Sequence, residues 1–179
     1  MTINRFKLTL TAIIVVVMIT VGGNVATAQE LAKRGTVLEQ IEQNQLNRRS
    51  IVDELLDYAF TFRGVPYRYG MASPRGFDCS GFTSYVFKRF GYNLTRTSYG
   101  QVNDGVRVER EDLQPGDLVF FAGRAIGRRI GHVGIVTRVN DDNTFNFIHA
   151  ACHTGITESR SNETYYSRRY RGACRVIKD

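Results

Sequence analysis

The sequence predicts an α+β domain in which helices come first and antiparallel strands follow. Apolar residues recur at helical spacing within residues 51–60 and again within residues 79–90. Beyond residue 115, apolar residues alternate or form short blocks between turn residues, which is typical of strands. The chain of 179 residues is long enough for one such domain with its own core and short for two.

The first 28 residues have the composition of a cleaved export signal. Arg5 and Lys7 precede an apolar run from Leu8 to Val21, and small residues end the segment at Ala26-Thr27-Ala28. The apolar run of about 14 residues is too short to span a bilayer comfortably. We therefore expect residues 1–28 to be a signal peptide, cleaved after Ala28. An uncleaved N-terminal anchor is the alternative.

Residues 29–49 are predicted to be a polar leader between the signal peptide and the folded domain. Glutamine, glutamate and asparagine are frequent there, and the apolar residues give too thin a helical face to pack well. The folded domain is expected to cover residues 50–179. Its first helix should begin at Ser50, which is a favourable N-cap residue, and should end at Gly64.

A second helix is expected to begin at Cys79, after a loop over residues 66–77. Gly91 is a natural C-terminal stop for this helix. Its buried face would be formed by Phe82, Tyr85, Val86 and Phe90. Residues 93–114 are predicted to be mostly loop. Strands are expected over residues 118–121, 132–139, 145–152 and 172–177.

Alternation assigns the side chains of the predicted strands to two faces of the sheet. In the second strand, Val133, Ile135, Thr137 and Val139 should share one face, and His132, Gly134 and Val136 the other. In the third strand, His149 should share a face with Phe145 and Phe147.

Cys79 is the strongest candidate for a nucleophile. The positive end of a helix lowers the pKa of a thiol, and a nearby imidazolium lowers it further. The backbone N–H groups that follow would hold an oxyanion formed on a substrate, and Gly81 would let the substrate approach closely. A buried or disulfide-bonded cysteine is the alternative for Cys79.

Two of the three histidines lie on predicted strands, where they could act on the cysteine. His132, which has a glycine before it, would be the general base, and His149 would hold it in the correct tautomer. His153 is a second candidate for the residue that orients His132, but it lies past the end of the predicted strand. A half-buried structural histidine is the alternative in each case. The run from His149 to His153 fits no common metal site, so we expect no metal and no cofactor.

The chain holds three cysteines, an odd number for an exported protein. One thiol for chemistry and one disulfide would account for them. Cys152 and Cys174 lie in predicted strands near the end of the chain, and they could form that disulfide if the two strands are neighbours. Two free thiols are the alternative.

The chain has a net charge of +7, which falls to +5 when Arg5 and Lys7 leave with the signal peptide. A mildly basic exported protein suits an anionic partner such as a wall polymer, although solubility alone would also explain the charge. We expect no nucleic-acid partner, because the basic residues are scattered and export removes the usual target.

An ordered series of short motifs from about residue 50 to residue 177 resembles the NlpC-type cell-wall cysteine peptidases. The motifs are Gly64-Val65-Pro66-Tyr67-Arg68-Tyr69-Gly70, Gly76-Phe77-Asp78-Cys79-Ser80-Gly81-Phe82, Arg96-Thr97-Ser98 with Gln101, Leu113-Gln114-Pro115-Gly116-Asp117-Leu118-Val119-Phe120-Phe121, Gly131-His132-Val133-Gly134-Ile135-Val136 and Phe147-Ile148-His149-Ala150. Several motifs at consistent spacing are more specific than one cysteine and histidine pair. The chain departs from the family where Met71 follows Gly70 in place of a second glycine.

The resemblance implies a papain-like fold, in which a helix that carries the cysteine packs on a small antiparallel sheet. It also implies a peptidase that cleaves peptidoglycan stem peptides, often between D-glutamate and the diamino acid. The implied catalytic residues are the nucleophile Cys79, the base His132 and the orienting His149.

The resemblance implies three further residues around the cysteine. Tyr67 matches a tyrosine whose hydroxyl lies near the nucleophile, and Asp78 and Ser80 match residues that shape the substrate pocket. Because stem peptides carry free carboxylates, we also expect arginines to bind them. The candidates are Arg75, close to the cysteine, and Arg124, Arg128 and Arg129, which lead to His132.

The protein is therefore expected to be an exported peptidoglycan endopeptidase in the periplasm or at the cell wall. We expect a monomer that stays out of the membrane once the signal peptide is removed. One alternative is an amidase or acyltransferase that uses the same cysteine and histidine on another amide or ester. Others are an inactive wall-binding domain and, less in keeping with an export signal, a toxin delivered into competitors.

Overall fold

The structure is a computed structural model that describes residues 28–123 and 129–178. The predicted signal peptide lies outside the described residues, apart from its last residue, Ala28. None of the described helices combines the length and the apolar character that a membrane crossing requires.

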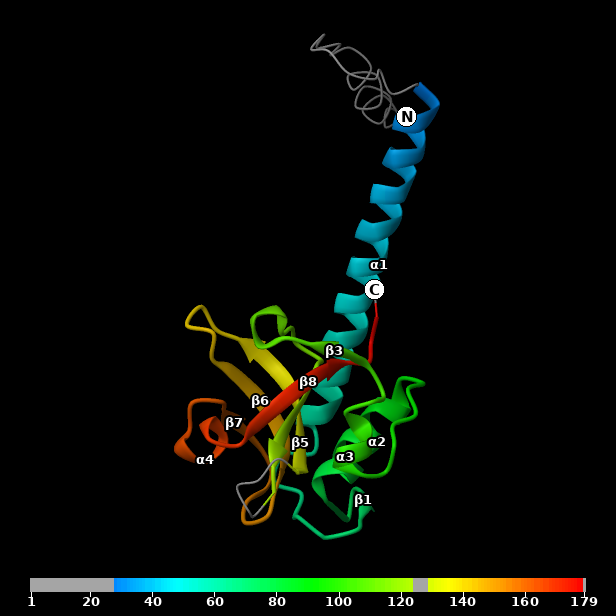
Figure 1. Ribbon diagram of the computed structural model, residues 1–179. Helices are drawn as coiled ribbons and strands as arrows, with labels where there is room; N and C mark the ends of the chain where they lie inside the picture. Colours follow the sequence, from blue (N-terminus) through cyan, green and yellow to red (C-terminus); the bar gives the residue numbers. More distant parts are fainter. Residues whose placement is uncertain (1–27, 124–128, 179) are drawn as a thin grey trace, which may run out of the picture. The chain divides into compact units, whose positions relative to one another are not determined.

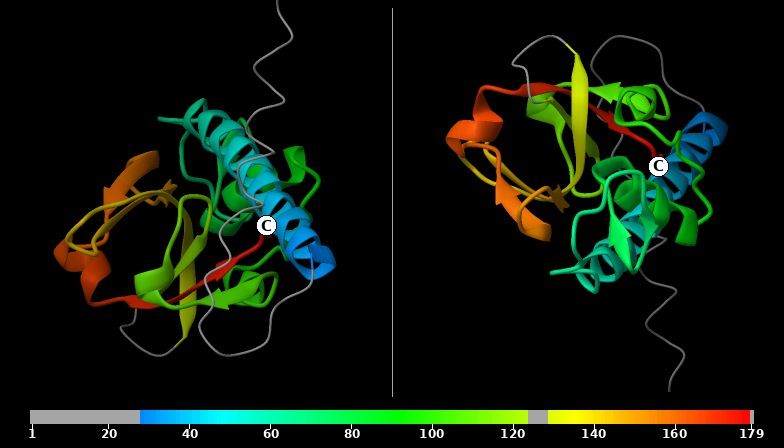
Figure 2. Two further views of the ribbon diagram at one scale, coloured as in Figure 1. Left: turned by 90° about the horizontal axis from the view of Figure 1, so that it is seen from above. Right: turned by 90° about the horizontal axis from the view of Figure 1, so that it is seen from below.

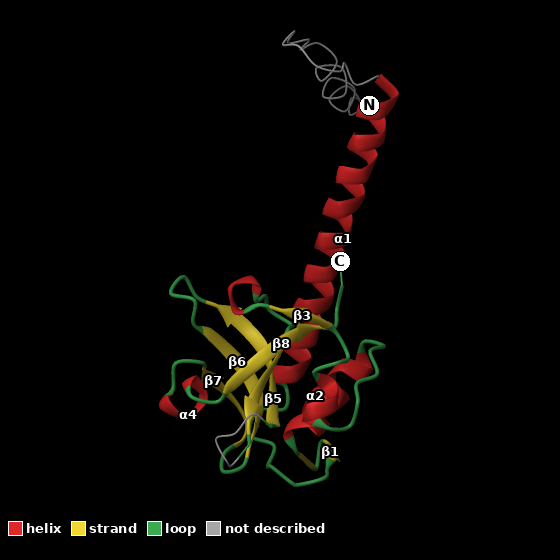
Figure 3. Cartoon of the chain, viewed as in Figure 1, coloured by secondary structure: helices red, strands yellow, loops and turns green. Residues whose placement is uncertain are grey.

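Helices and short strands make up the first part of the described chain, and longer strands follow (Figures 1 and 3). The first part contains α1 (Ala28–Phe60), β1 (Ala72–Ser73), β2 (Gly76–Phe77), α2 (Cys79–Arg89), α3 (Ser98–Gln101), β3 (Val106–Val108) and the 3-10 turn η1 (Arg110–Asp112). The second part contains β4 (Leu118–Ala122), β5 (Ile130–Val139), β6 (Phe145–Ala151), β7 (Gly155–Arg160), α4 (Thr164–Ser167) and β8 (Tyr170–Arg175).

Six strands form one antiparallel sheet in the order β3-β8-β4-β5-β6-β7. The C-terminal part of α1 and α2 lie on one side of this curved sheet, and α4 lies on the other side (Figure 2). The α+β prediction is therefore confirmed, including the cysteine-bearing helix against an antiparallel sheet.

The first helix starts earlier than we expected. α1 begins at Ala28 and runs through Ser50, so the predicted start at Ser50 is wrong. Its residues up to Glu39 belong to a separate unit, in which Leu31, Val37 and Leu38 are exposed. The part of α1 from Gln40 onward belongs to the compact unit with the sheet. The division into signal peptide, leader and domain stays a prediction.

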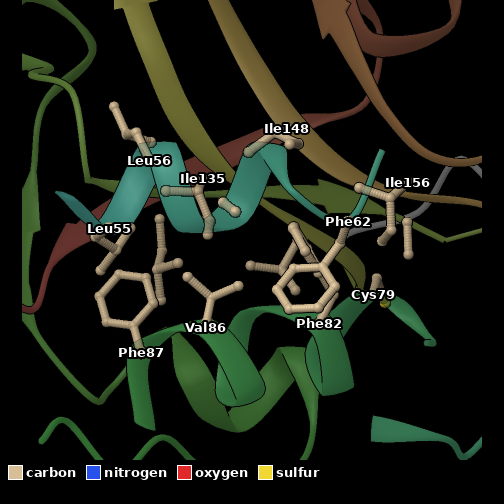
Figure 4. Close-up of a cluster of buried hydrophobic side chains, with 14 of the residues drawn as sticks. Leu55, Leu56, Phe62, Cys79, Phe82, Val86, Phe87, Ile135, Ile148 and Ile156 are labelled. Atoms are coloured by element: carbon tan, nitrogen blue, oxygen red, sulfur yellow. The ribbon is translucent and has the colours of Figure 1, made fainter. Parts of the chain in front are cut away.

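A large apolar cluster joins α1, α2 and one face of the sheet (Figure 4). The fully buried Leu55 from α1 and Phe82, Val86 and Phe87 from α2 meet Ile135 of β5 in this cluster. Burying one such side chain contributes about 1.5–3 kcal/mol to folding. The position of α2, and with it that of Cys79, is therefore set by packing against the sheet.

The other face of the sheet is covered as well. Alternate residues of β4 point to opposite sides, so that Leu118 and Phe120 join the first cluster while Val119 and Phe121 join a second one. Tyr166 of α4 packs into this second cluster. With both faces covered, all five residues of β4 are buried.

The strands predicted near residues 118, 132, 145 and 172 correspond to β4, β5, β6 and β8. The face predicted for Val139 is wrong, because the register of β5 against β6 shifts between Val136 and Arg138. Val139 packs against the same cluster as Val136, whereas Val133 and Ile135 belong to the other cluster. β7 was not predicted, although it forms an edge of the sheet.

A buried carboxylate ties the start of β4 to the C-terminal strand. Asp117 is fully buried and accepts two hydrogen bonds from Arg175, at 2.8 Å to Oδ1 and 2.9 Å to Oδ2. Arg48 of α1 lies 3.7 Å from the same carboxylate and also donates to the carbonyl of Ile177 at 3.1 Å. Three distant segments of the chain therefore meet at Asp117.

We predict that Asp117→Ala lowers the free energy of unfolding by about 3–5 kcal/mol, because it leaves the Arg175 and Arg48 charges without their buried partner. Urea unfolding followed by circular dichroism measures this change. Asp141→Ala, in an exposed turn, is the control and should change stability by less than about 0.5 kcal/mol. Equal stability of the two variants would contradict a structural role for Asp117.

Candidate active site

Cys79 is the first residue of α2, as the sequence predicted. The preceding residue, Asp78, caps the helix, and its Oδ1 atom accepts a hydrogen bond from the Gly81 N–H at 2.6 Å. Such a cap satisfies one of the free N–H groups at a helix start and fixes where the helix begins. The cap therefore fixes the backbone that carries the Cys79 thiol.

The Asp78 carboxylate is itself held from two further sides. Arg96 donates to both carboxylate oxygens, at 2.9 Å to Oδ1 and 2.7 Å to Oδ2, and the Gly70 N–H donates to Oδ2 at 2.8 Å. The Arg96 guanidinium also donates to the Ser80 hydroxyl at 3.1 Å. Asp78 and Ser80 thus share Arg96, which lies in one of the family-like motifs but was not predicted to be a site residue.

A buried glutamine supports the same helix turn from inside. Gln101 of α3 is fully buried, donates to the Ser80 carbonyl at 3.1 Å and accepts from the Thr83 hydroxyl at 2.8 Å. These bonds satisfy a polar side chain that would otherwise be costly to bury. Together with the Asp78 cap, they hold the first turn of α2 rigidly.

The Cys79 sulfur lies against the strand that carries His132. Sγ is 4.0 Å from the carbonyl oxygen of Gly131, and the side chain is 8% exposed. Burial, followed by the charge of Asp78, raises the pKa of the Cys79 thiol to about 11, and hydrogen bonds from the Ser80 and Val133 N–H groups lower it by less. The lowered thiol pKa that we expected from the helix start is thus absent, because burial outweighs it.

His132 and His149 form a hydrogen-bonded pair on neighbouring strands. Nε2 of His132 lies 3.0 Å from Nδ1 of His149, with the two rings nearly perpendicular at 86°. Burial lowers the pKa of His132 to about 4. Burial, followed by the charge of His132, holds the pKa of His149 well below its usual value. Both rings are therefore neutral at physiological pH.

The site is thus a neutral thiol beside β5, whose neutral His132 pairs with the neutral His149 of β6. In the described part of the chain, Nδ1 of His132 makes no hydrogen bond, so it is the ring nitrogen with a free position. An imidazole with one nitrogen held and the other free can accept a proton during a reaction. No group of three or more potential metal ligands occurs among the residues that the structure describes.

Tyr67 packs against the apolar cluster that contains Cys79, and its part in the site stays a prediction. Burial raises the pKa of the Tyr67 hydroxyl, with smaller contributions from the negative charges that Cys79, Cys152 and Asp78 can carry. Cys152 is exposed and is the first residue after β6.

The disulfide expected between Cys152 and Cys174 does not form, and all three cysteines are free thiols. The two segments are not neighbours, because β4 and β5 separate β6 from β8 in the sheet. At about 4.8 Å per strand, this separation is far beyond the reach of a disulfide. Cys174 is buried instead and donates to the carbonyl of Gln101 at 3.4 Å.

The remaining candidates lie apart from these contacts. Arg75 is exposed in the turn between β1 and β2, and Arg129 is exposed just before β5. Arg124 and Arg128 lie outside the described residues. His153 is exposed beyond the end of β6. Carboxylate binding by the arginines therefore stays a prediction.

Two glycines make room for protein groups in the site. A Cβ atom on Gly134 would lie 2.6 Å from the Phe147 ring and 3.1 Å from Cβ of His149, so a glycine there allows the histidine its position. A Cβ atom on Gly81 would collide with the Met71 carbonyl. The space at Gly81, which we had assigned to substrate, is thus occupied by the protein itself.

Residues 64–175 match the NlpC/P60 family. The chain is 36% identical over 136 residues to the murein DD-endopeptidase MepS/murein LD-carboxypeptidase of Escherichia coli K12, covering 75% of this chain and 68% of that protein. It is 46% identical over 70 residues to a gamma-D-glutamyl-L-lysine dipeptidyl-peptidase of Bacillus cereus, covering 39% of this chain and 21% of that protein.

A similar fold is present among solved structures. The crystal structure of an NlpC/P60 family protein from Bacillus cereus superposes with a TM-score of 0.64 at 34% identity. The match covers 71% of this chain and 40% of that chain. The similarity spans the helix that carries Cys79 and the sheet that carries both histidines.

We predict that Cys79 alkylation by iodoacetamide is slow at pH 7 and accelerates about tenfold per pH unit through pH 10. The thiolate is the reacting form, and a thiol pKa near 11 keeps that form scarce until the pH approaches this value. Mass spectrometry of the Cys79 peptide separates it from Cys152. In urea the rate should level off near pH 9, as for an ordinary thiol. A plateau below pH 7 in the folded protein would contradict this prediction.

We further predict that Gly134→Ala lowers kcat/KM by about tenfold or more, because the added methyl group displaces the Phe147 ring and His149. Overpacking of this kind also costs about 1–3 kcal/mol of stability. Peptidase assays on folded protein measure the first effect. Gly35→Ala, where a methyl group meets no neighbour within 4 Å, is the control and should leave the rate unchanged.

Proposed function

Because this chain belongs to the NlpC/P60 family and is a cysteine peptidase, we propose that it hydrolyses an amide bond in the stem peptides of peptidoglycan. The observation that carries the proposal is the Cys79 sulfur at a capped helix start, 4.0 Å from the backbone of the strand that presents the His132–His149 pair. Two relatives whose names specify murein or gamma-D-glutamyl-L-lysine activities support the substrate class.

In the proposed reaction, Cys79 is the nucleophile and His132 the general base. Nδ1 of His132 takes the thiol proton as the sulfur attacks the amide carbon, so the ion pair forms during the attack and not before it. The thiol and imidazole pKa values of about 11 and about 4 support this order, since both groups start neutral.

The tetrahedral intermediate carries a negative oxygen that needs hydrogen-bond donors. We assign this task to the N–H groups at the start of α2 and to the Tyr67 hydroxyl. The imidazolium of His132 then gives its proton to the leaving amine, which breaks the C–N bond and leaves a thioester. Water activated by the same imidazole hydrolyses the thioester and restores the thiol.

His149 orients the base. In the tautomer that this reaction requires, Nδ1 of His149 accepts the Nε2–H of His132 across the 3.0 Å between the two atoms, which leaves Nδ1 of His132 as a lone pair for the thiol proton. When His132 becomes an imidazolium, the same hydrogen bond becomes charge-assisted and stronger. The orienting histidine therefore favours the charged state that forms during the reaction.

We propose the bond between D-glutamate and the diamino acid as the one that is cleaved, which agrees with the name of the Bacillus cereus relative. Cleavage of a D,D bond is the second candidate, which the name of the Escherichia coli relative favours. Export by residues 1–28, action in the periplasm or at the wall, and a monomeric state complete the proposal.

Digestion of purified muropeptides, with the products identified by mass spectrometry, tests the proposal. We expect the protein lacking residues 1–28 to release products cut on the carboxyl side of D-glutamate. Cys79→Ala should lower the rate by at least about 1,000-fold, because the proposed thioester forms on the Cys79 sulfur. Asp141→Ala, in an exposed turn, is the control and should retain cleavage.

Products cut only at D,D bonds would support the second candidate and refute the first. Full cleavage by Cys79→Ala would remove Cys79 as the nucleophile. Lack of cleavage by the wild-type protein, together with turnover of other amides or esters, would favour the amidase or acyltransferase alternative. Binding of wall fragments without any turnover would favour the inactive domain.

A further inference from the structure

A tyrosine extends the histidine pair into a line of three side chains. Tyr166 lies in α4, between β7 and β8, and its hydroxyl oxygen is 3.3 Å from Nε2 of His149. Tyr166 is only 9% exposed and His149 is fully buried, so water does not compete for this hydrogen bond. Tyr166 was not among the residues predicted for the site.

The three side chains can share their protons in two ways. In the first arrangement, His132 donates from Nε2 to His149 Nδ1, and His149 donates from Nε2 to the Tyr166 oxygen. In the second arrangement, Tyr166 donates to His149 Nε2, and His149 donates from Nδ1 to His132. Each neutral ring carries one proton, so the two arrangements exclude each other.

Only the first arrangement suits a general base. It leaves Nδ1 of His132 as a lone pair, whereas the second arrangement places a proton there. It is also the arrangement that an imidazolium at His132 requires, because that ion donates from both of its nitrogens. The Nε2–H of buried His149 then needs an acceptor, and the Tyr166 oxygen is within reach.

The surroundings of the hydroxyl allow it to accept. Burial raises the pKa of the Tyr166 hydroxyl to about 12, with a smaller opposite effect from the Ser159 side chain of β7, so the phenol stays neutral and its oxygen keeps lone pairs that can accept. The Tyr166 ring packs against Phe121 and Phe147, with centroids 5.2 Å and 4.8 Å away. A phenylalanine ring would make the same contacts, so packing alone does not account for the hydroxyl.

We propose that Tyr166 is a positioning residue whose phenol oxygen accepts the Nε2–H of His149 and thereby keeps His149 Nδ1 as the acceptor for His132. This inference rests on the proposed function, because it assigns Tyr166 a part in the same reaction. Tyr166 contacts the two histidine rings, and in the proposal it acts through them.

The first test uses the unmodified protein without any substrate. Long-range nitrogen–hydrogen NMR spectra of the nitrogen-15-labelled protein show which ring nitrogens carry a proton. At pH 7 we expect a proton on Nε2 of His149 and none on its Nδ1. A proton on Nδ1 of His149 would overturn the proposal, whatever the activity of the protein.

The second test is Tyr166→Phe, which removes only the hydroxyl. We expect kcat/KM to fall by about 10- to 100-fold, the range for losing a hydrogen bond that supports a charged group. The NMR spectra should lose the single His149 tautomer. Tyr165→Phe is the matched control, because the Tyr165 side chain is next in sequence but 51% exposed. This variant should leave the rate and the His149 tautomer unchanged.

The outcomes separate this inference from the proposed function. If Tyr166→Phe keeps both the wild-type rate and the wild-type tautomer, the positioning role is refuted while the peptidase function stands. If the wild-type protein cleaves no muropeptide, the proposed function fails, and so does any positioning role in it, even with His149 protonated at Nε2. A melting temperature for each variant shows whether the variant is folded. If Tyr166→Phe does not fold, the NMR spectrum of the unmodified protein decides whether Nε2 of His149 carries the proton.

Discussion

The Asp78 carboxylate is the contact on which the site depends. It caps α2 through the Gly81 N–H and holds the preceding loop through the Gly70 N–H. It also accepts hydrogen bonds from the two terminal guanidinium nitrogens of Arg96. A carboxylate with this many donors has one position only. The next residue is Cys79, so the position of the thiol follows from that of the cap. The packing of Phe82 and Val86 on the sheet then fixes the distance between helix and strand.

Two opposite effects act on the Cys79 sulfur, and burial is the larger. The helix start and its N–H groups favour the thiolate, whereas burial and the Asp78 charge favour the thiol and raise its pKa to about 11. Burial also keeps His132 neutral, with a pKa of about 4. Charge therefore separates only when a substrate is attacked. A cysteine of this kind resists alkylation and oxidation while the site is empty.

Local patterns predicted the fold well, while contacts between distant segments escaped them. The spacing after Cys79 predicted α2, and alternation correctly assigned His149 to the face of Phe145 and Phe147. The Cys152–Cys174 pairing was wrong because strand order depends on the whole sheet and not on either strand. Val139 was assigned to the wrong face because a register shift leaves no mark in the sequence. Tyr166 sits on a helix of one turn, too short for any periodicity.

The thiol comes from a helix and the two rings come from a sheet, and a large apolar cluster joins these layers. The reactive geometry is therefore assembled across a seam in the core, not within one continuous stretch of backbone. A shift of about 1 Å along that seam is enough to cost two orders of magnitude in rate. The catalytic rate consequently depends on how tightly α2 packs against the sheet. Heating that loosens this packing would abolish catalytic activity at a temperature at which the helices and strands are still folded.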